Sequence, residues 1–160
     1  MPRVRVVLQR VTWAAVAVGG EEVARIGRGL LALVGARVGD EVADAERLAR
    51  KTVRLRLFGD GERGFERSLL DVGGSLLCVS QFTLLGDVRR GNRPSWARAA
   101  RPEVAAPLVD AYADAVAGEG VPVARGRFGA TMGVSLENDG PVTLVVDSED
   151  FDLPRRAAYP

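Results

Sequence analysis

Histidine is absent from the 160 residues of this chain, and cysteine and lysine each occur only once. Without histidine, the catalytic Ser-His-Asp and Cys-His arrangements and the usual zinc sites are excluded. The single cysteine, Cys78, excludes an intramolecular disulfide, and its place in an apolar run indicates a small buried hydrophobe rather than a nucleophile. An enzyme of this composition would use hydroxyls, carboxylates, backbone groups or its own substrate, and we expect neither a metal nor another cofactor.

Long hydrophobic runs are also missing, since no stretch approaches the roughly 20 apolar residues that span a bilayer. The opening "MPRVRVVLQR" alternates charged and apolar residues, which is typical of a strand rather than a signal peptide. A hydrophobic content of 47% with 27% charged residues suits a globular protein of this length. We therefore expect a cytoplasmic protein with one domain over residues 1–147 and a loose polar tail over 148–160.

The charge is nearly balanced, with 22 basic and 21 acidic residues, which is not the overall signature of a nucleic-acid-binding protein. One segment differs: residues 85–101, "LGDVRRGNRPSWARAAR", carry five arginines and one aspartate. Two interpretations stay open for it. The segment is either a solvated surface loop or a phosphate-binding surface, since the planar guanidinium group donates paired hydrogen bonds to phosphate.

Apolar periodicity predicts many strands and two helices in an order without regular βαβ alternation. The fold expected from this order is a mixed α/β class with a mainly antiparallel, barrel-like sheet and flanking helices. The predicted strands cover residues 3–18, 30–35, 73–85, 121–128, 131–138 and 141–147, with a turn at Gly19-Gly20. The predicted helices cover 39–58, with Asp40 as N-cap, and 102–117, with Pro102 in the first turn and Pro107 indicating a break or a late start. Residues 59–67 are expected to form a polar loop.

A polar group follows the apolar run in "VSQFTL", residues 79–84. Alternation along a strand would place Ser80 and Phe82 on one face and Gln81 and Thr83 on the other. A hydroxyl and an amide at the end of a strand can position a water or stabilise an oxyanion. The alternative is a strand that simply emerges into solvent.

The stretch "LENDGPVTLVVD", residues 136–147, carries two apolar runs around Asn138-Asp139-Gly140-Pro141. These four residue types favour turns, so the stretch is interpreted first as a hairpin loop. A second interpretation is functional. The Gly140–Pro141 bond can be cis, which would direct two successive carbonyls the same way and form a stiff acceptor pair for an ammonium group.

Together, "SQFTL" at 80–84 and "NDGPVT" at 138–143 resemble the motif pair of the D-aminoacyl-tRNA deacylases. The resemblance extends over residues 3–147, through "LQRVTWAAVAV", "GRGLLALVG", "RGNRPSW" and "GRFGATMGVSLENDGPVT". It departs at Glu66, where the family usually has asparagine, and it does not include the residues from about 148 onward.

The resemblance implies a homodimer with active sites at the interface, where the Gly140–Pro141 tip of one subunit enters the site of the other. There the tip would hold the ammonium group of the amino acid and reject the L-side chain. It also implies that Ser80, Gln81, Phe82 and Thr83 line the pocket for the terminal adenosine of tRNA. Three further residues match substrate-binding positions, namely Met132 in the pocket, Arg10 as the support of the tip, and Asn138. The implied substrates are D-aminoacyl-tRNA and glycine mischarged on alanine tRNA.

The mechanism stays open between hydrolysis assisted by the ribose 2′-OH and covalent catalysis by Thr83. An aminoacyl ester is already activated, so positioning and an oxyanion donor suffice for the first. A threonine nucleophile needs an adjacent base, which no histidine can supply, so Thr83 is favoured as a positioning group. Two other functions remain: an RNA- or nucleotide-binding dimer without catalysis, and a hydrolase of free D-amino-acid esters.

Overall fold

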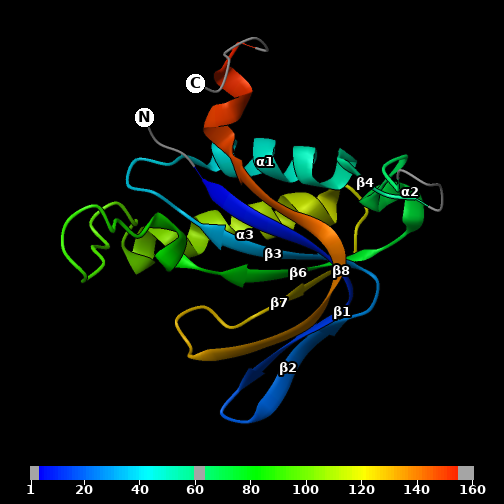
Figure 1. Ribbon diagram of the computed structural model, residues 1–160, viewed down its shortest axis with the longest axis horizontal. Helices are drawn as coiled ribbons and strands as arrows, with labels where there is room; N and C mark the ends of the chain where they lie inside the picture. Colours follow the sequence, from blue (N-terminus) through cyan, green and yellow to red (C-terminus); the bar gives the residue numbers. More distant parts are fainter. Residues whose placement is uncertain (1–3, 60–63, 155–160) are drawn as a thin grey trace.

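One long strand, β1 (Arg5–Val18), organises the fold of the computed structural model, which describes residues 4–59 and 64–154. Along one edge it pairs antiparallel with β8 (Met132–Asp147), from Arg5 opposite Asp147 to Val18 opposite Met132. Along the other edge its first half pairs with β3 (Gly29–Gly35) and its second half with β2 (Glu21–Ile26). A single strand thereby joins the two strands that follow it in sequence, β2 and β3, to β8 from the far end of the described chain (Figure 1).

The sheet continues from β3 through two parallel pairings, to β6 (Ser75–Ser80) and then to β7 (Val123–Arg125). The strand order is β2-β1-β3-β6-β7, with β8 paired to β1. This strongly curved, nearly closed sheet confirms the predicted mixed α/β class and barrel-like architecture. The strands expected near 3–18, 30–35 and 121–128 are confirmed, with shifted bounds.

Two helices cover one face of the sheet, α1 (Val42–Arg54) and α3 (Pro102–Gly118), and they pack against each other (Figure 1). Smaller elements complete the described chain. These are β4 (Arg56–Phe58), β5 (Arg67–Ser68), α2 (Leu69–Val72) and the 3₁₀ helices η1 (Phe82–Leu85) and η2 (Ser148–Asp152). Of the helices in the described ranges, none has the length and apolar character needed to cross a membrane.

Both faces of the central strands are buried, which explains their continuous apolar sequences. In β3, Leu30 and Val34 belong to the core shared with α1 and α3, whereas Leu31 belongs to a second core enclosed by the curved sheet. β6 repeats this alternation, with Leu76 on the helix side and Leu77 on the inner side. The sheet is therefore the middle layer between two apolar clusters.

Three expectations about helices and strands are wrong in detail. Helix α1 is shorter than the predicted 39–58, and its N-cap is Glu41 rather than Asp40. Pro107 lies inside α3 without breaking it, because the buried face of that helix outweighs one lost backbone hydrogen bond. The strands predicted at 131–138 and 141–147 are one strand, β8, so residues 136–147 do not form a hairpin loop.

The two segments expected to be loops or tails are described only in part. Within the predicted loop 59–67, residues 60–63 lie outside the described residues, and β5 begins at Arg67. In the tail expected to be loose, η2 is held by the Ser148 N–H bond to the Val4 carbonyl and by an ion pair of Asp152 with Arg47. Residues 155–160 lie outside the described range.

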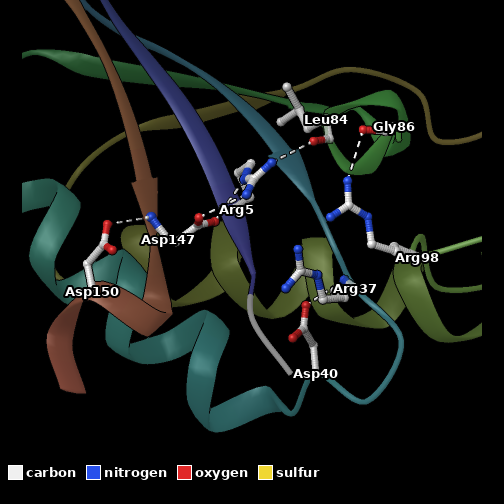
Figure 2. Close-up of polar contacts among 8 residues, drawn as sticks. All are labelled: Arg5, Arg37, Asp40, Leu84, Gly86, Arg98, Asp147 and Asp150. Atoms are coloured by element: carbon white, nitrogen blue, oxygen red, sulfur yellow. Dashed lines mark hydrogen bonds and ion pairs between the residues drawn. The ribbon is translucent and has the colours of Figure 1, made fainter. Parts of the chain in front are cut away.

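Asp40 carries a different role from the one predicted. The residue is 8% exposed, and its carboxylate accepts a hydrogen bond from the Arg37 backbone N–H at 2.5 Å (Figure 2). Burial raises the pKa of Asp40 to about 6, although the Arg37 N–H acts in the opposite direction. The carboxyl therefore holds its proton more tightly in the folded chain than in the unfolded chain, where the pKa of aspartate is near its ordinary value of 3.8.

This shift predicts a pH-dependent stability that Asp40→Asn should remove. Between about pH 4 and pH 6 the folded state binds the proton that the unfolded state has lost, so the Asp40 contribution to the free energy of unfolding falls as pH rises. Urea denaturation at pH 4, 5, 6 and 7 should show a steeper decline for the parent than for Asp40→Asn, which keeps an acceptor for Arg37. Identical profiles for the two proteins would contradict the assignment.

Candidate functional site

The chain leaves the sheet at Ser80, the last residue of β6, and turns into η1. The Gln81 N–H still bonds to the Val34 carbonyl at 2.8 Å, which docks the start of the turn on β3. The predicted strand alternation therefore fails beyond Ser80, because Phe82 and Thr83 belong to a 3₁₀ helix. The Gln81 amide instead donates to the Thr83 hydroxyl at 2.5 Å.

Two arginines from outside the turn hold its backbone in place (Figure 2). Arg5 of β1 donates to the Leu84 carbonyl at 3.0 Å while its Nε is paired with Asp147 at 2.9 Å. Arg98 donates to the Gly86 carbonyl at 3.2 Å. The conformation of residues 81–86 thus depends on β1, the end of β8 and the segment before α3.

A pocket of about 580 Å³ opens beside this turn. Its lining is mainly apolar, and Ser80, Gln81 and Phe82 contribute to it together with Met132 of β8. Phe82 and Trp96 are 54% and 43% exposed, and their rings meet edge to face with centroids 5.4 Å apart. An apolar pocket with a few polar groups and exposed aromatic rings suits a flat, partly polar ligand such as a nucleobase.

The second group of predicted residues lies elsewhere, where β8 bulges away from β1. Thr143 pairs with Gln9 and Asn138 pairs with Val11, so residues 139–142 together stand opposite Arg10 alone. The Gly140–Pro141 bond is cis, and both residues are exposed at the tip of this bulge. We refer to residues 138–142 as the tip.

Side chains replace the missing backbone pairing around the tip. The Asn138 amide donates to the Arg10 carbonyl at 3.0 Å and to the Val142 carbonyl at 3.1 Å. Arg10 donates to the Leu57 carbonyl at 2.6 Å. Its Nε also lies 3.0 Å from the Asp139 carboxylate, as an ion pair without hydrogen-bond geometry. The tip is therefore held by its own Asn138 side chain and by the Arg10 side chain of β1.

Within one described chain, these two groups do not meet. The pocket is lined by Ser80, Gln81, Phe82 and Met132, and the tip residues are not part of its lining. Thr83 does not line it either, although its hydroxyl bonds to Gln81, which does. Trp96 and Arg5 were not predicted as site residues. An aromatic beside an arginine-rich segment was a usable signal for Trp96, whereas no local pattern marks Arg5.

The ionisable chemistry of the site is limited. Burial raises the pKa of the Cys78 thiol to about 12, so it is not a thiolate at neutral pH. In the described part of the chain, the hydrogen-bond partner of the Thr83 hydroxyl is the Gln81 amide, which cannot serve as a base. The described residues also contain no group of three or more His, Cys, Asp or Glu side chains placed to hold a metal ion. The site offers amide, hydroxyl and backbone groups.

Comparison with known proteins gives a consistent result. Residues 7–147 match the sequence model of the family described as D-Tyr-tRNA(Tyr) deacylase. The D-aminoacyl-tRNA deacylase of Chloroflexus aurantiacus is 58% identical over 153 residues, covering 96% of each chain. That of Bacillus licheniformis is 50% identical, covering 91% of this chain and 99% of its own.

Two solved structures are similar in fold. A chain titled c-Myc DNA Unwinding Element Binding Protein superposes with a TM-score of 0.82 at 39% identity, covering 89% of this chain and 97% of its own. A probable eukaryotic D-amino acid tRNA deacylase superposes with a TM-score of 0.79 at 20% identity, covering 91% and 99%. The second likeness concerns the fold alone.

Proposed function

Since this chain belongs to the D-aminoacyl-tRNA deacylase family and hydrolyses the ester between a D-amino acid and tRNA, we propose that its pocket and its tip form one active site across a homodimer. The observation that carries this proposal is the separation of the two groups within one chain. The pocket near Ser80 and the exposed Gly140–Pro141 tip each have their own supporting contacts, yet the tip is not part of the pocket lining. A second copy can supply the tip that the pocket lacks.

In this arrangement the terminal adenosine of tRNA occupies the pocket beside η1. The apolar walls and Phe82 contact the base, while Ser80 and Gln81 supply hydrogen bonds to its polar edge and to the ribose. Met132 of β8 contributes a further apolar contact from the pocket lining. The aminoacyl ester then lies at the mouth of the pocket, where a tip from the partner subunit would reach it.

The tip acts as the chiral filter. Its backbone carbonyls accept hydrogen bonds from the ammonium group of the amino acid, and the backbone excludes the side chain of an L-residue by contact. Arg10 and Asn138 hold this backbone in position. Arg10 contacts Leu57 and Asp139, and Asn138 bonds to Val142. Glycine has no side chain to exclude, so glycine mischarged on alanine tRNA is also a substrate.

The chemical step is hydrolysis assisted by the tRNA itself. An aminoacyl ester is already activated, and the neighbouring ribose 2′-OH can position or activate a water. Backbone N–H groups of η1 and the Gln81 amide are the available donors for the oxyanion. Thr83 acts as a positioning group through its bond with Gln81. The reaction takes place in the cytoplasm, where charged tRNA is found.

The test is hydrolysis of D-tyrosyl-tRNA against L-tyrosyl-tRNA by the purified protein, with and without a metal chelator. We expect selective loss of the D-ester in both conditions. Equal cleavage of the two esters would contradict the chiral filter. Binding of tRNA without cleavage would indicate a non-catalytic RNA-binding dimer. Equally efficient cleavage of D-tyrosine methyl ester would indicate a small-molecule esterase.

A further inference from the structure

A second surface lies next to the pocket, on a hairpin closed by Asp87 and Ser95. The Asp87 N–H bonds to the Ser95 carbonyl and the Ser95 N–H to the Asp87 carbonyl, each at 2.8 Å. All residues from 88 to 95 are exposed. Figure 1 shows this 87–95 hairpin as the green loop that projects at the left of the molecule.

The arginines of this segment are not equivalent. Arg98 is directed inward and donates to the Gly86 carbonyl. Arg89 is paired with Asp87 at 2.6 Å, and this guanidinium holds the pKa of the Asp87 carboxyl well below its usual range. Arg90 and Arg93 are exposed and make no hydrogen bond or ion pair through their side chains within the described ranges. Two uncompensated positive charges therefore face solvent on the hairpin.

The hairpin is continuous with the pocket. A hollow of about 440 Å³ is lined by Asp87, Arg89, Arg90 and Ser95. The next residue, Trp96, lines the pocket beside η1 and packs against Phe82. If the last base of a nucleic-acid strand occupies the pocket, the preceding nucleotides must run either along the hairpin or away from it on the opposite side.

We propose that the 87–95 hairpin binds the phosphates of the single-stranded 3′ end of tRNA, through Arg90 and Arg93. The proposal rests on the proposed function, because it places the terminal adenosine in the adjoining pocket. The planar guanidinium fork matches a phosphate with paired hydrogen bonds, and the hairpin has no unpaired acid to oppose it. Trp96 separates the two parts and offers a ring for a base between them.

The test compares the parent with the double variant Arg90→Gln/Arg93→Gln. With D-tyrosyl-tRNA, we expect KM to rise about tenfold while kcat is unchanged, because lost phosphate contacts weaken binding and not the chemical step. The plot of log(kcat/KM) against log salt concentration should become shallower by about 1.4, which corresponds to two single-strand phosphate contacts. With D-tyrosyl-adenosine, which has no phosphate, parent and variant should be equal.

A matched control has the same loss of charge at the far end of the molecule. Arg50 of α1 and Arg56 near α1 are both exposed, and β4, which begins at Arg56, lies on the side of Figure 1 opposite the hairpin. Arg50→Gln/Arg56→Gln should therefore leave the salt slope nearly unchanged. An equal effect of the two double variants would show a general charge effect and overturn the proposal.

Other outcomes separate this proposal from the proposed function. If the parent cleaves both substrates but the hairpin variant matches it on tRNA at every salt concentration, the hairpin proposal alone is overturned. If the parent cleaves neither, the proposed function fails, and binding of uncharged tRNA still decides the hairpin's role. A parent whose tRNA affinity and salt slope exceed those of Arg90→Gln/Arg93→Gln supports the phosphate contacts, and equal affinities overturn them.

Discussion

A Gly140→Ala variant should fold normally and lose about 100-fold in kcat/KM toward D-tyrosyl-tRNA, the size of effect that follows from displacing a substrate by about 1 Å. Within its own chain, an added Cβ at residue 140 would meet only the Asn138 Oδ1, at an ordinary contact distance of 3.7 Å. The stability of the variant should therefore be close to that of the parent. The loss would arise where the tip meets the substrate, because the methyl group would occupy space beside the ammonium group and the α-carbon.

The control for this variant is Ser135→Ala, an exposed position on the same strand whose side chain is not part of the tip or the pocket lining. Its activity should equal that of the parent. Thermal unfolding of both variants checks that any loss is not a loss of fold. Parent-like activity of Gly140→Ala toward the D-ester would contradict the placement of residue 140 in the active site.

A Gly35→Ala variant should be both less stable and less active, because Gly35 packs directly against the η1 turn. A Cβ at this position would lie 2.9 Å from the Gln81 carbonyl oxygen and 2.5 Å from Leu85 Cδ2. The leucine tip can move, but the carbonyl belongs to a backbone segment docked on Val34. We expect a loss of about 1–3 kcal/mol in the free energy of unfolding, as for an overpacked core. We also expect kcat to fall by about tenfold or more, because displacing the turn moves the groups that position the substrate.

The matched control is Gly27→Ala, in the turn before β3, where an added Cβ would meet nothing within 4 Å. Activity should be compared at a temperature at which Gly35→Ala is fully folded, so that lower kcat reports the displaced turn rather than unfolded protein. Full activity under those conditions would show that the position of Gln81 does not affect the reaction. A parent-like stability would show that β3 and the turn separate without cost.

The fold class could be predicted because apolar runs such as residues 30–35 mark strands, and the order of strands and helices lacks regular βαβ alternation. The same kind of reasoning failed at residues 136–147. Asn, Asp, Gly and Pro favour turns locally, but β8 continues through them because Arg10 and the Asn138 amide, more than a hundred residues apart in sequence, replace the lost backbone pairing. Pairing of this kind has no local signature.

For the candidate site, the sequence supplied residues whose roles stay predictions, and it did not supply their geometry. The resemblance identified the turn near Ser80 and the tip near Gly140, and the structure places each in a distinct setting. The 3₁₀ conformation after Ser80 depends on carbonyl contacts from Arg5 and Arg98, which no periodicity could reveal. Likewise, Asp40 was predicted as a helix cap from its residue type, whereas in the structure its buried carboxylate accepts a hydrogen bond from the Arg37 backbone N–H.

The pairing of β1 with β8 has a consequence for how this protein is made. A ribosome completes β1, β2 and β3 early, but the partner for a whole edge of β1 is synthesised more than a hundred residues later. Until then that edge presents unpaired N–H and C=O groups, a state in which nascent chains are prone to pair wrongly with one another. Such distant contacts also slow folding, because closing the long intervening loop costs conformational entropy before the β1–β8 hydrogen bonds form. Synthesis of the segment that carries the tip is thus also the step that covers the open edge of β1.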